Sequence, residues 1–583
     1  MRGSREARGT IGTMPQSSLS ADRVFRLLGR ELSEEDLREA LFRSKVEFHG
    51  RKDGLLDLEV TPDRLDLLDE GGLAWELQGI LNLAGGLPYA PEPAPRPGVE
   101  AHANPTVSPL RPELVMATAS APPGQALDAG DLEELVRFQE ILHATLGRDR
   151  VAASLGLYPL ERIQPPFRYV LEPLDQIRFV PLGGSEEMGG REFYATHRMA
   201  ETYGSLGRSE GLALTLRDSR GTILSLPPVL NAAGPGELRP GDREILIEAT
   251  GTRLSRTREM VGMMLLPFAA RGWKIHPVPI HRSGNADPGR EAVEPRTLPV
   301  SSGSVAQVLG IRLTGPEMEK GLLAARLGVD REGTECLVRV PPWRPDILSS
   351  LDVVEDLAVA HGFASLSPVL PVAPSPGRTL PFRRFLRRWT QAALGLGFQE
   401  IYTPLLMSRE AAERFSPPAE ALRLSNPVSR EFSHLRPVLR ATALDFLGRT
   451  TGQGYPQRIF EVGPVVVRDP SSETGTRTDV HGVLLEAGKE TGFARAAGIL
   501  EYLTRLVGIQ TSREPVDSPG TIRGRAARVR WAGEDIAVCG EVFPAALAEL
   551  RIPEPVAFVE MNLSQIWSLR GTPRAPGTGS PSV

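Results

Sequence analysis

The chain has 583 residues, of which 41% are hydrophobic and 24% are charged, and its formal net charge is −5. This length exceeds what one hydrophobic core usually supports, so we expect several domains of ~100 to 200 residues, and because no run of about 18 uncharged apolar residues occurs, we expect no membrane-spanning helix. The negative charge excludes capture of nucleic acid by an overall positive field, so such a partner must be held by local basic patches or by shape.

The first residues, MRGSREARGTIGTMPQSS, carry charges but no apolar core segment, so they do not resemble a secretory signal. We treat residues 1–13 as a possible non-native leader, with Met14 as the alternative start. Only two cysteines occur, Cys336 and Cys539, which is too few for a disulfide framework or a four-cysteine zinc site. This cysteine count fits a reducing cytoplasm.

A repeat with two copies flanks the middle of the chain. The first copy contains LLGRELSEEDLREALF and LLDLEVTPDRLDLL, and the second contains VLGIRLTGPEMEKGLL and ECLVRVPPWRPDIL. In both, a Ser or Thr helix cap has an acidic residue three positions later (Ser33 with Asp36, Thr314 with Glu317), and both end on Val-x-Pro-x-Arg-x-Asp. Each copy therefore predicts a helix, a strand, a proline-fixed turn and a second helix, which together form a small mixed module.

Between the two copies, residues 112–290 alternate short apolar runs with turn residues, which predicts a sheet-rich domain with a few helices. Two strand-like runs, LSLPPVLN and ILIEATGT, end in polar side chains. Ser225, Asn231, Glu248 and Thr250 are therefore candidates to orient a water and bind an ester. Ser and Thr are also common on strands, and no His or Cys base accompanies these residues, so no nucleophilic triad can be drawn and a structural role stays open.

Four acidic residues, which we call the acidic quartet, follow the turn of the second repeat: Asp346, Asp352, Glu355 and Asp356. The last three share one helix face and repel one another by about 0.2 to 0.5 kcal/mol per pair, so a cation or an Arg or Lys partner must neutralise them. Carboxylate oxygens suit Mg²⁺. The alternatives are a solvated acidic face and attraction to a helix N-terminus. The equivalent positions in the first repeat are Gly72, Trp75 and Glu76. We therefore infer that the scaffold does not require the quartet, which favours a metal site.

Two proline-rich polar stretches, Pro88–Pro112 and Pro368–Pro381, are predicted to be linkers. The second precedes a region, Phe382–Trp567, where amphipathic helices alternate with strands, which predicts an α+β domain with a mostly antiparallel sheet. Within it, GLGFQEIYTPLL and QRIFEVG, which contains Arg458 and Glu461, form helix-to-strand and strand segments that are not specific alone.

Taken together, these segments resemble the archaeal and eukaryotic-type beta subunit of phenylalanyl-tRNA synthetase, in order from about Leu27 to Trp567. The segments that carry the resemblance are EVTPDRLDLL, LHATLGRDR, PPFRY, IRFVPL, LSLPPVLN, IEATGT, VPPWRPDILSSLDVVEDLAVAHGF, LGFQEIYTPLL, NPVSREFSHLRP and YPQRIFEVG. Gly395–Pro404 resembles the first motif of class II synthetases and Arg458–Glu461 a degenerate second motif. No third motif with its ATP-binding Arg follows.

The resemblance implies a multidomain α+β fold. Duplicated small α/β modules would flank a β-rich B3/B4-type editing domain, and a non-catalytic antiparallel-sheet domain like that of class II synthetases would follow. The implied ranges are 14–90 for the first module, 91–294 for the editing and tRNA-binding domain, 295–371 for the second, B5-like module, 376–569 for the synthetase-like domain and 570–583 for a disordered tail.

In function, the resemblance implies ATP-dependent attachment of phenylalanine to tRNA(Phe) by a cytoplasmic complex of two alpha and two beta subunits. The alpha subunit would bind phenylalanine and ATP, and this chain alone would be inactive in aminoacylation. Two alternatives stay open: a stand-alone deacylase of mischarged tRNA, and a non-catalytic RNA-binding paralogue. The acidic quartet favours the ligase subunit, because a deacylase has no need of it.

The resemblance also implies that the acidic quartet binds Mg²⁺ shared with the alpha subunit. It assigns Ser225, Asn231 and Thr250 to a pocket that hydrolyses tyrosine wrongly attached to tRNA(Phe). This chain departs from the family there, with Tyr158–Leu160 (YPL) in place of His-Asp-Leu, AAGPGELRPGD in place of a Thr-rich stretch, and Arg253 at the end of the usual TGTD. Since a misplacement of ~1 Å can cost ~10²-fold in rate, we expect weak editing.

Overall fold

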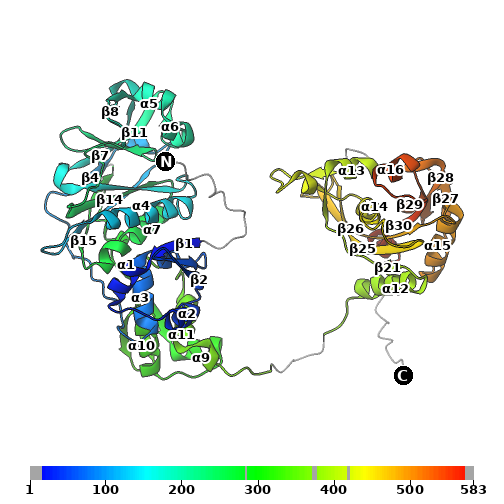
Figure 1. Cartoon of the computed structure of the whole chain (residues 1–583), viewed down its shortest axis with the longest axis horizontal. Helices are drawn as coiled ribbons and strands as arrows, with labels where there is room; N and C mark the ends of the chain where they lie inside the picture. Colours follow the sequence, from blue (N-terminus) through cyan, green and yellow to red (C-terminus); the bar gives the residue numbers. More distant parts are fainter. Residues whose placement is uncertain (1–15, 283–284, 371–376, 417–419, 572–583) are drawn as a thin grey trace, which may run out of the picture. The chain divides into compact units, whose positions relative to one another are not determined.

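The computed structural model describes residues 16–282, 285–370, 377–416 and 420–571 (Figure 1). The chain divides into two compact units, residues 1–370 and 371–583, which are described separately here. Within the described ranges, no helix combines the length and the apolar character needed to cross a membrane. The predicted leader, 1–13, and the predicted tail from 572 onward lie outside the described residues.

The repeat is confirmed as two modules with one order of elements, strand–helix–helix–strand–strand–helix. The first module contains β1 (Gln16–Ser20), α1 (Ala21–Leu28), α2 (Glu34–Arg43), β2 (Glu47–Lys52), β3 (Leu55–Glu59) and α3 (Glu70–Ile80). The second contains β18 (Arg296–Ser301), α9 (Ser302–Leu309), α10 (Gly315–Ala324), β19 (Gly328–Glu332), β20 (Glu335–Val340) and α11 (Ser350–His361). Their antiparallel sheets also correspond, with orders β1-β3-β2 and β18-β20-β19.

Both predicted helix caps are present. The Ser33 hydroxyl accepts a hydrogen bond from the backbone N–H of Asp36 at 3.1 Å, and the Thr314 hydroxyl accepts one from Glu317 at 3.4 Å. The prediction omitted the first strand and first helix of each module and one strand of its hairpin. The short opening strands, QSSLS and RTLPVS, carry too little apolar alternation to be recognised from sequence.

Two sheets form the middle of the first unit, which confirms its predicted sheet-rich character. The larger has the order β13-β12-β11-β7-β4-β16-β17, with β10 beside β11, and the smaller has the order β15-β5-β14-β6. Their strands are β4 (Ala101–Ala103), β5 (Glu113–Ser120), β6 (Ala153–Pro159), β7 (Phe167–Pro173), β10 (Arg208–Ser209), β11 (Leu212–Arg217), β12 (Ile223–Leu226), β13 (Leu230–Asn231), β14 (Glu244–Gly251), β15 (Lys274–Pro277), β16 (Ile280–Arg282) and β17 (Asn285–Asp287). The remaining elements are α4 (Ala129–Ala144), β8 (Arg178–Phe179), β9 (Met188–Gly189), α5 (Gly190–Thr196), α6 (Arg198–Tyr203), α7 (Leu254–Met264) and α8 (Leu266–Ala270).

The smaller sheet is buried on both faces, and its strands contribute side chains to two separate cores. Successive side chains of a strand point to opposite sides of the sheet, so neighbouring residues enter different cores. On β6, Tyr158 packs with Leu224 and Leu246 in the core shared with the larger sheet, whereas Leu157 packs in the core that includes α4 and α7. This arrangement places the polar ends of β12 and β14 close to β6, where the candidate site lies.

The linker prediction for Pro88–Pro112 was wrong. Tyr89 is buried and donates a hydrogen bond to the carbonyl of Val293 at 2.7 Å, and β4 pairs in parallel with β7 and β16. The prolines lie outside β4, whose Ala101 and Ala103 both point into the core, so the segment adds a strand to the larger sheet. Residues 371–376 of the second predicted linker lie outside the described residues.

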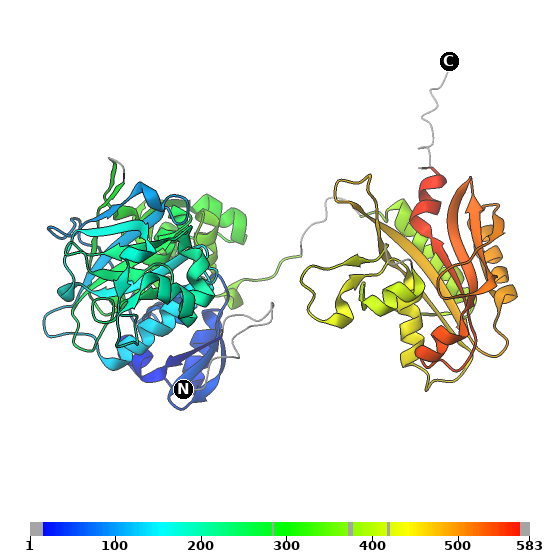
Figure 2. The ribbon, with the colours of Figure 1, turned by 90° about the horizontal axis from the view of Figure 1, so that it is seen from above.

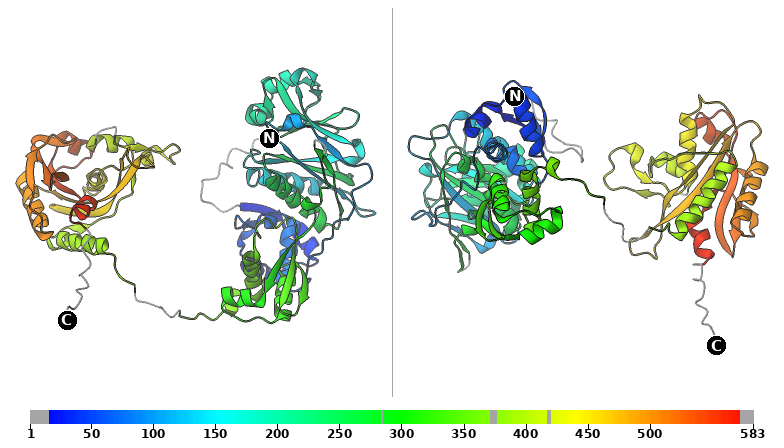
Figure 3. Two further views of the ribbon diagram at one scale, coloured as in Figure 1. Left: turned by 180° about the vertical axis from the view of Figure 1, so that it is seen from behind. Right: turned by 90° about the horizontal axis from the view of Figure 1, so that it is seen from below.

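The second unit is built on one large sheet with helices on both faces (Figures 2 and 3). Its order is β21-β25-β26-β30-β29-β28-β27, antiparallel except for the pair β21 and β25. The strands are β21 (Gln399–Glu400), β25 (Gln457–Arg468), β26 (Thr476–Ala487), β27 (Ser512–Pro515), β28 (Thr521–Trp531), β29 (Glu534–Val542) and β30 (Val556–Asn562), beside a small sheet of β22 (Leu406–Met407), β24 (His434–Leu435) and β23 (Leu422–Arg423). The helices are α12 (Pro381–Gly395), α13 (Arg409–Phe415), α14 (Leu439–Arg449), α15 (Phe493–Leu506), α16 (Pro544–Glu549) and α17 (Leu563–Leu569). The α+β class is thereby confirmed.

Candidate functional site

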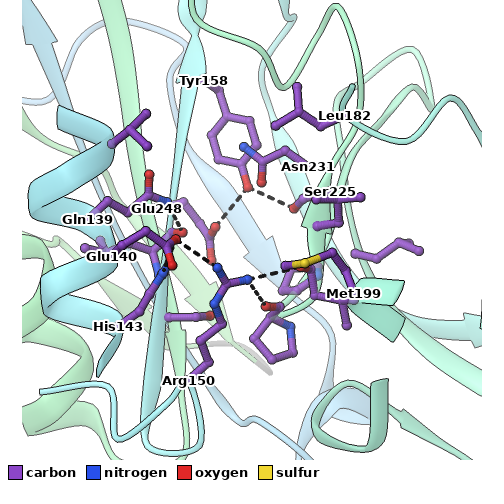
Figure 4. Close-up of a pocket in the computed structure, with 18 residues that line it drawn as sticks. Gln139, Glu140, His143, Arg150, Tyr158, Leu182, Met199, Ser225, Asn231 and Glu248 are labelled. Atoms are coloured by element: carbon purple, nitrogen blue, oxygen red, sulfur yellow. Dashed lines mark hydrogen bonds and ion pairs between the residues drawn. The ribbon is translucent and has the colours of Figure 1, made fainter. Parts of the chain in front are cut away.

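A pocket of about 250 Å³ lies beside α4, where the two sheets of the middle domain meet (Figure 4). Three of the four residues predicted for a hydrolytic site line it: Ser225 on β12, Asn231 on β13 and Glu248 on β14. Its other polar lining residues are Gln139, Glu140, His143, Arg150, Ser154 and Tyr158. The pocket therefore forms where strands of both sheets come together. The sequence predicted three of its residues but not the others.

Glu248 is the buried carboxyl group of this pocket. Its Oε2 lies 3.0 Å from the Tyr158 hydroxyl, and among the described residues its Oε1 has no hydrogen-bond partner. Burial raises the pKa of Glu248 from 4.5 to about 8, against the opposing effects of the Tyr158 hydrogen bond and the Arg111 charge. The carboxyl group is therefore largely protonated near neutral pH and is able to exchange a proton with a bound group.

Tyr158 points into the pocket from β6, and its side chain is fully buried (Figure 4). Its hydroxyl donates toward Ser225 Oγ at 2.8 Å as well as approaching Glu248. Burial raises the pKa of Tyr158 well above its usual value, so the phenol stays neutral. The sequence marked Tyr158 as a departure from the family but did not show that it contacts two of the candidate residues.

Asn231 and Thr250 differ in how they relate to the pocket. The Asn231 amide nitrogen donates to the carbonyl of Gly236 at 3.0 Å and contacts that of Leu157 at 3.4 Å, so it holds the backbone around the pocket. Thr250 does not line the pocket. It lies two residues beyond Glu248 on β14, and its hydroxyl lies 3.2 Å from Ser154 Oγ. A rise of about 7 Å over two strand residues explains this displacement.

Sequence reasoning missed the charged group on the helical side of the pocket. Arg150 donates to Glu140 Oε1 at 2.9 Å, and the same oxygen lies 3.1 Å from His143 Nδ1. His143 Nε2 accepts from the backbone N–H of Leu155 at 2.9 Å, and burial lowers the pKa of His143, so its imidazole is neutral and both ring nitrogens are engaged. His143 is therefore not a free general base. The i, i+3 spacing of Glu140 and His143 before LGRDR was the available signal.

The acidic quartet separates into two pairs: Asp346 and Asp356, which face Arg344 and which we call the buried pair, and Asp352 and Glu355, which lie nearer the surface and which we call the exposed pair. Asp346 and Asp356 both contact the buried guanidinium of Arg344, at 2.7 and 2.8 Å. Against the effect of burial, the Arg344 charge lowers the pKa of Asp346, whereas burial raises the pKa of Asp356. Arginine thus supplies the positive charge that the sequence analysis required from a cation or a basic partner.

The first module contains the same arrangement. Arg64 donates to Asp66 Oδ2 and to Glu76 Oε2, each at 2.9 Å. These positions correspond to Arg344, Asp346 and Asp356 in the second module, and the two guanidinium groups face one small cavity of about 10 Å³. The inference that the scaffold does not require the quartet was therefore wrong for Asp346 and Asp356, because both modules use an acid at these places to hold their arginine.

The exposed pair has other local partners. Asp352 is the third residue of α11 and accepts hydrogen bonds from the backbone N–H groups of Leu348 and Ser349, at 2.8 and 2.7 Å, as part of a capping box. Glu355 forms an ion pair of 2.6 Å with Lys45 of the first module. The described residues contain two carboxylate-rich groups whose ligand atoms lie within 4.8 Å of one another, Glu47–His49–Glu59 and Asp69–Glu70–Glu134, and neither includes a member of the quartet.

In the second unit, the residues of the degenerate second motif pair within the sheet. Arg458 donates to Glu486 at 3.0 Å on the neighbouring strand. Glu461 is fully buried and accepts from Arg436 at 2.9 Å and from the Thr403 hydroxyl at 2.6 Å. Glu461 is therefore engaged by Arg436 and Thr403 in the interior of the unit, whereas Arg458 is half-buried and bonds to Glu486 through its Nε.

Comparison with known proteins identifies relatives over nearly the whole chain. A family model for the phenylalanyl tRNA synthetase beta chain CLM domain matches residues 366–563, and one for the tRNA synthetase B5 domain matches 298–363. The phenylalanine–tRNA ligase beta subunit of Korarchaeum cryptofilum is 32% identical, over 94% of this chain and 98% of that protein. The corresponding subunit of Pyrococcus furiosus is 30% identical, over 95% and 100%. A crystal structure of an N-terminal fragment of the phenylalanyl-tRNA synthetase beta subunit from Pyrococcus horikoshii has a TM-score of 0.55 at 25% identity and covers 60% of this chain and 99% of the fragment.

Proposed function

The chain belongs to the family of phenylalanine–tRNA ligase beta subunits, and from this membership we propose how it serves the charging of tRNA with phenylalanine. In the proposal, two copies assemble with two alpha subunits, which bind phenylalanine and ATP, while this chain supports the alpha active site and positions tRNA(Phe). The observation that carries it is similarity through both units, over 94 to 95% of the chain. A deacylase needs only the middle domain, so this coverage favours the ligase.

The proposal assigns no aminoacylation chemistry to this chain. In its support, Arg436 and Glu461 are buried in the second unit and bond to each other and to Thr403. The guanidinium of Arg436 is therefore not available to bind the phosphate of a nucleotide. The experiment is co-expression with the alpha subunit followed by a charging assay. Charging by the purified complex supports the proposal, and phenylalanine-dependent pyrophosphate exchange by this chain alone refutes it.

Ligases of this family use ATP and Mg²⁺, and the residues of the quartet fit a shared magnesium ion only in part. Asp346 and Asp356 are turned toward the buried guanidinium of Arg344, whose single positive charge offsets part of their negative charge, so these two are engaged inside the module. Glu355 is exposed and Asp352 is half-buried, and both have the oxygen ligands that Mg²⁺ prefers. We propose that this exposed pair presents the ion to the alpha subunit, which supplies further ligands, while Asp346 and Asp356 position α11.

We also propose weak hydrolytic editing of Tyr-tRNA(Phe) in the middle-domain pocket. In this reaction water attacks the ester carbonyl, the bond to the tRNA ribose breaks, and tyrosine is released. Glu248, whose Oε1 has no hydrogen-bond partner among the described residues, is the group that can exchange the proton, and Asn231 holds the backbone that surrounds the bound ester. The assay is deacylation of Tyr-tRNA(Phe) by the complex. We expect slow hydrolysis that falls in Asn231→Ala and is kept in Thr250→Val, which changes a residue outside the pocket. Robust hydrolysis that survives Asn231→Ala would show that the pocket is misplaced.

A further inference from the structure

The hydroxyl of Tyr158 occupies the polar end of the pocket, between the two side chains best suited to bind a hydroxyl group. It lies 2.8 Å from Ser225 Oγ and 3.0 Å from Glu248 Oε2 (Figure 4). The ring of Tyr158 belongs to the core cluster that includes Leu224 and Leu246. A hydroxyl has one proton to donate and lone pairs to accept, so it can donate to one of these neighbours and accept from the other. Ser225 Oγ and one oxygen of Glu248 are thereby engaged by a residue of the chain itself, while Glu248 Oε1 has no partner among the described residues.

The space around this hydroxyl is closely fitted. A Cβ atom added at Gly156 would lie 2.3 Å from the Tyr158 hydroxyl oxygen and 2.7 Å from Glu248 Oε2. Gly156 pairs with Glu248 across β6 and β14, so the glycine opens the slot in which hydroxyl and carboxyl meet. The slot is therefore formed by Gly156, Ser225 and Glu248 around one hydroxyl-sized group.

Protein sites that recognise a ligand hydroxyl use this chemistry. A site with a buried acceptor and a buried donor at fixed positions binds a ligand with a hydroxyl group more tightly than the same ligand without it. The ligand without the hydroxyl leaves both buried polar groups unpaired. In this pocket the ring and hydroxyl of Tyr158 together have the composition of a bound phenol. A second phenol cannot reach Ser225 and Glu248 while the Tyr158 ring is in place, because core side chains are close-packed and do not overlap.

We propose that Tyr158, in the wall of the pocket, fills the place that a ligand phenol would take against Ser225 and Glu248, that it thereby excludes phenol-bearing ligands from these two groups, and that removal of its ring uncovers a phenol-binding site. This inference deepens the proposed editing function and rests on it for the biological substrate, since a tyrosyl ester carries a phenol. It gives a physical reason for the weak editing that we expect. Ser225 and Glu248 can recognise the hydroxyl of a tyrosine, but they are bonded to the hydroxyl of Tyr158.

The test uses Tyr158→Ala in the full-length chain, assembled with the alpha subunit, and phenol as the probe, because this substitution removes a phenol-sized group. Binding is measured by calorimetry and by the rise in melting temperature, with benzene as the analogue that lacks the hydroxyl. We expect no binding of phenol to this pocket in the unsubstituted protein. We expect Tyr158→Ala to bind phenol, with a preference over benzene of about tenfold, the value of one net hydrogen bond.

Two further variants control the test. Tyr158→Ala combined with Ser225→Ala keeps the cavity but removes one polar partner, so the preference for phenol over benzene is expected to fall. Tyr169→Ala removes another fully buried tyrosine of the same core, whose hydroxyl donates to the Arg111 carbonyl at 3.0 Å, and reports the loss of stability without opening this pocket. If Tyr158→Ala is insoluble, it is produced with phenol or with benzene in the medium, and a soluble yield that depends on phenol is the supporting result.

Three results overturn the inference: binding of phenol in the pocket of the unsubstituted protein, equal binding of phenol and benzene by Tyr158→Ala, or binding of neither. Deacylation of Tyr-tRNA(Phe) by the same variant is scored separately. Phenol binding without deacylation leaves the role of Tyr158 intact and counts against editing. Deacylation without phenol binding supports editing and counts against the role of Tyr158.

Discussion

At the scale of single residues, the ionisation of Glu248 reports most directly on the candidate pocket. Burial raises its pKa from 4.5 to about 8 in the folded chain. Between these values the unfolded chain has lost a proton that the folded chain keeps, so the free energy of unfolding falls as the pH rises. The stabilisation that protonated Glu248 gives the folded chain is present in full below pH 4.5 and is lost once the pH passes about 8. Between these values the free energy of unfolding falls by up to about 1.4 kcal/mol per pH unit.

Glu248→Gln removes this titration while keeping the shape of the side chain. We therefore expect the melting temperature of the variant, relative to the unsubstituted chain, to rise steadily from pH 5 to pH 8. Thermal melts of both proteins at intervals across this range make the comparison, in which other titrating groups cancel. A difference that stays constant with pH would show that Glu248 ionises normally.

Gly156 is the second residue whose substitution tests the pocket. In Gly156→Ala the new Cβ would lie 2.3 Å from the Tyr158 hydroxyl oxygen, so Tyr158 and Glu248 must separate. We expect a loss of about 1 to 3 kcal/mol in the free energy of unfolding, typical of an overpacked core. Gly498→Ala, on α15 with open space around its Cβ, is the matched control and should not destabilise the chain. Equal melting temperatures for the two variants would contradict the fitted slot.

The sequence predicted Ser225, Asn231 and Glu248 because each follows or ends a strand with a polar side chain. It did not place Tyr158 among them, since Tyr158 is 67 residues from Ser225 and 90 from Glu248. The pairing of β6 with β14 brings Tyr158 close to Glu248, and the packing of the two sheets brings it close to Ser225 on β12. Thr250 was included because it lies near Glu248 in sequence, but the rise along the strand carries it out of the pocket.

At the scale of elements, the two modules explain why the acidic quartet is not one site. Arg64 and Arg344 each bind two acids of their own module. The sequences of the two copies differ here, with Glu76 in the first and Asp356 in the second. Both side chains nevertheless place a carboxylate against the arginine of their own module. Sequence alone predicted the repeat, its caps and its turn. It could not show which carboxylates face inward, because that depends on how α3 and α11 pack against the arginines.

The buried and exposed pairs of the quartet should therefore respond differently to substitution. Asp356→Ala leaves Arg344 with one fewer buried partner, and we expect it to cost about 3 kcal/mol in the free energy of unfolding. Asp352→Ala with Glu355→Ala removes a helix cap and an exposed ion pair, and we expect a cost of about 1 to 2 kcal/mol. Urea unfolding of each variant measures both quantities.

The same variants distinguish a metal role from a structural one. In the assembled ligase we expect Asp352→Ala with Glu355→Ala to lower phenylalanine charging per folded molecule about tenfold or more, and to shift the Mg²⁺ concentration needed for half-maximal charging upward. Asp352→Asn with Glu355→Gln, which removes the charge with little loss of size, should behave similarly. Unchanged charging and an unchanged Mg²⁺ requirement in both double variants would leave the exposed pair without a metal role.

At the scale of the whole molecule, similarity to phenylalanine–tRNA ligase beta subunits extends through both units. The proposed function assigns the chemistry of charging to the alpha subunit. The order of the segments in the sequence was sufficient to predict the family and the α+β class. The partner surface was beyond prediction from this sequence, because an interface depends on complementarity to a second chain.

Charging of tRNA(Phe) with phenylalanine, measured for this chain alone, for the alpha subunit alone and for the two together, tests the assignment most directly. We predict no charging and no phenylalanine-dependent pyrophosphate exchange by this chain alone, and charging by the mixture at a rate well above that of the alpha subunit alone. Charging by this chain alone, or a rate for the mixture equal to that of the alpha subunit alone, would contradict its role as the non-catalytic beta subunit.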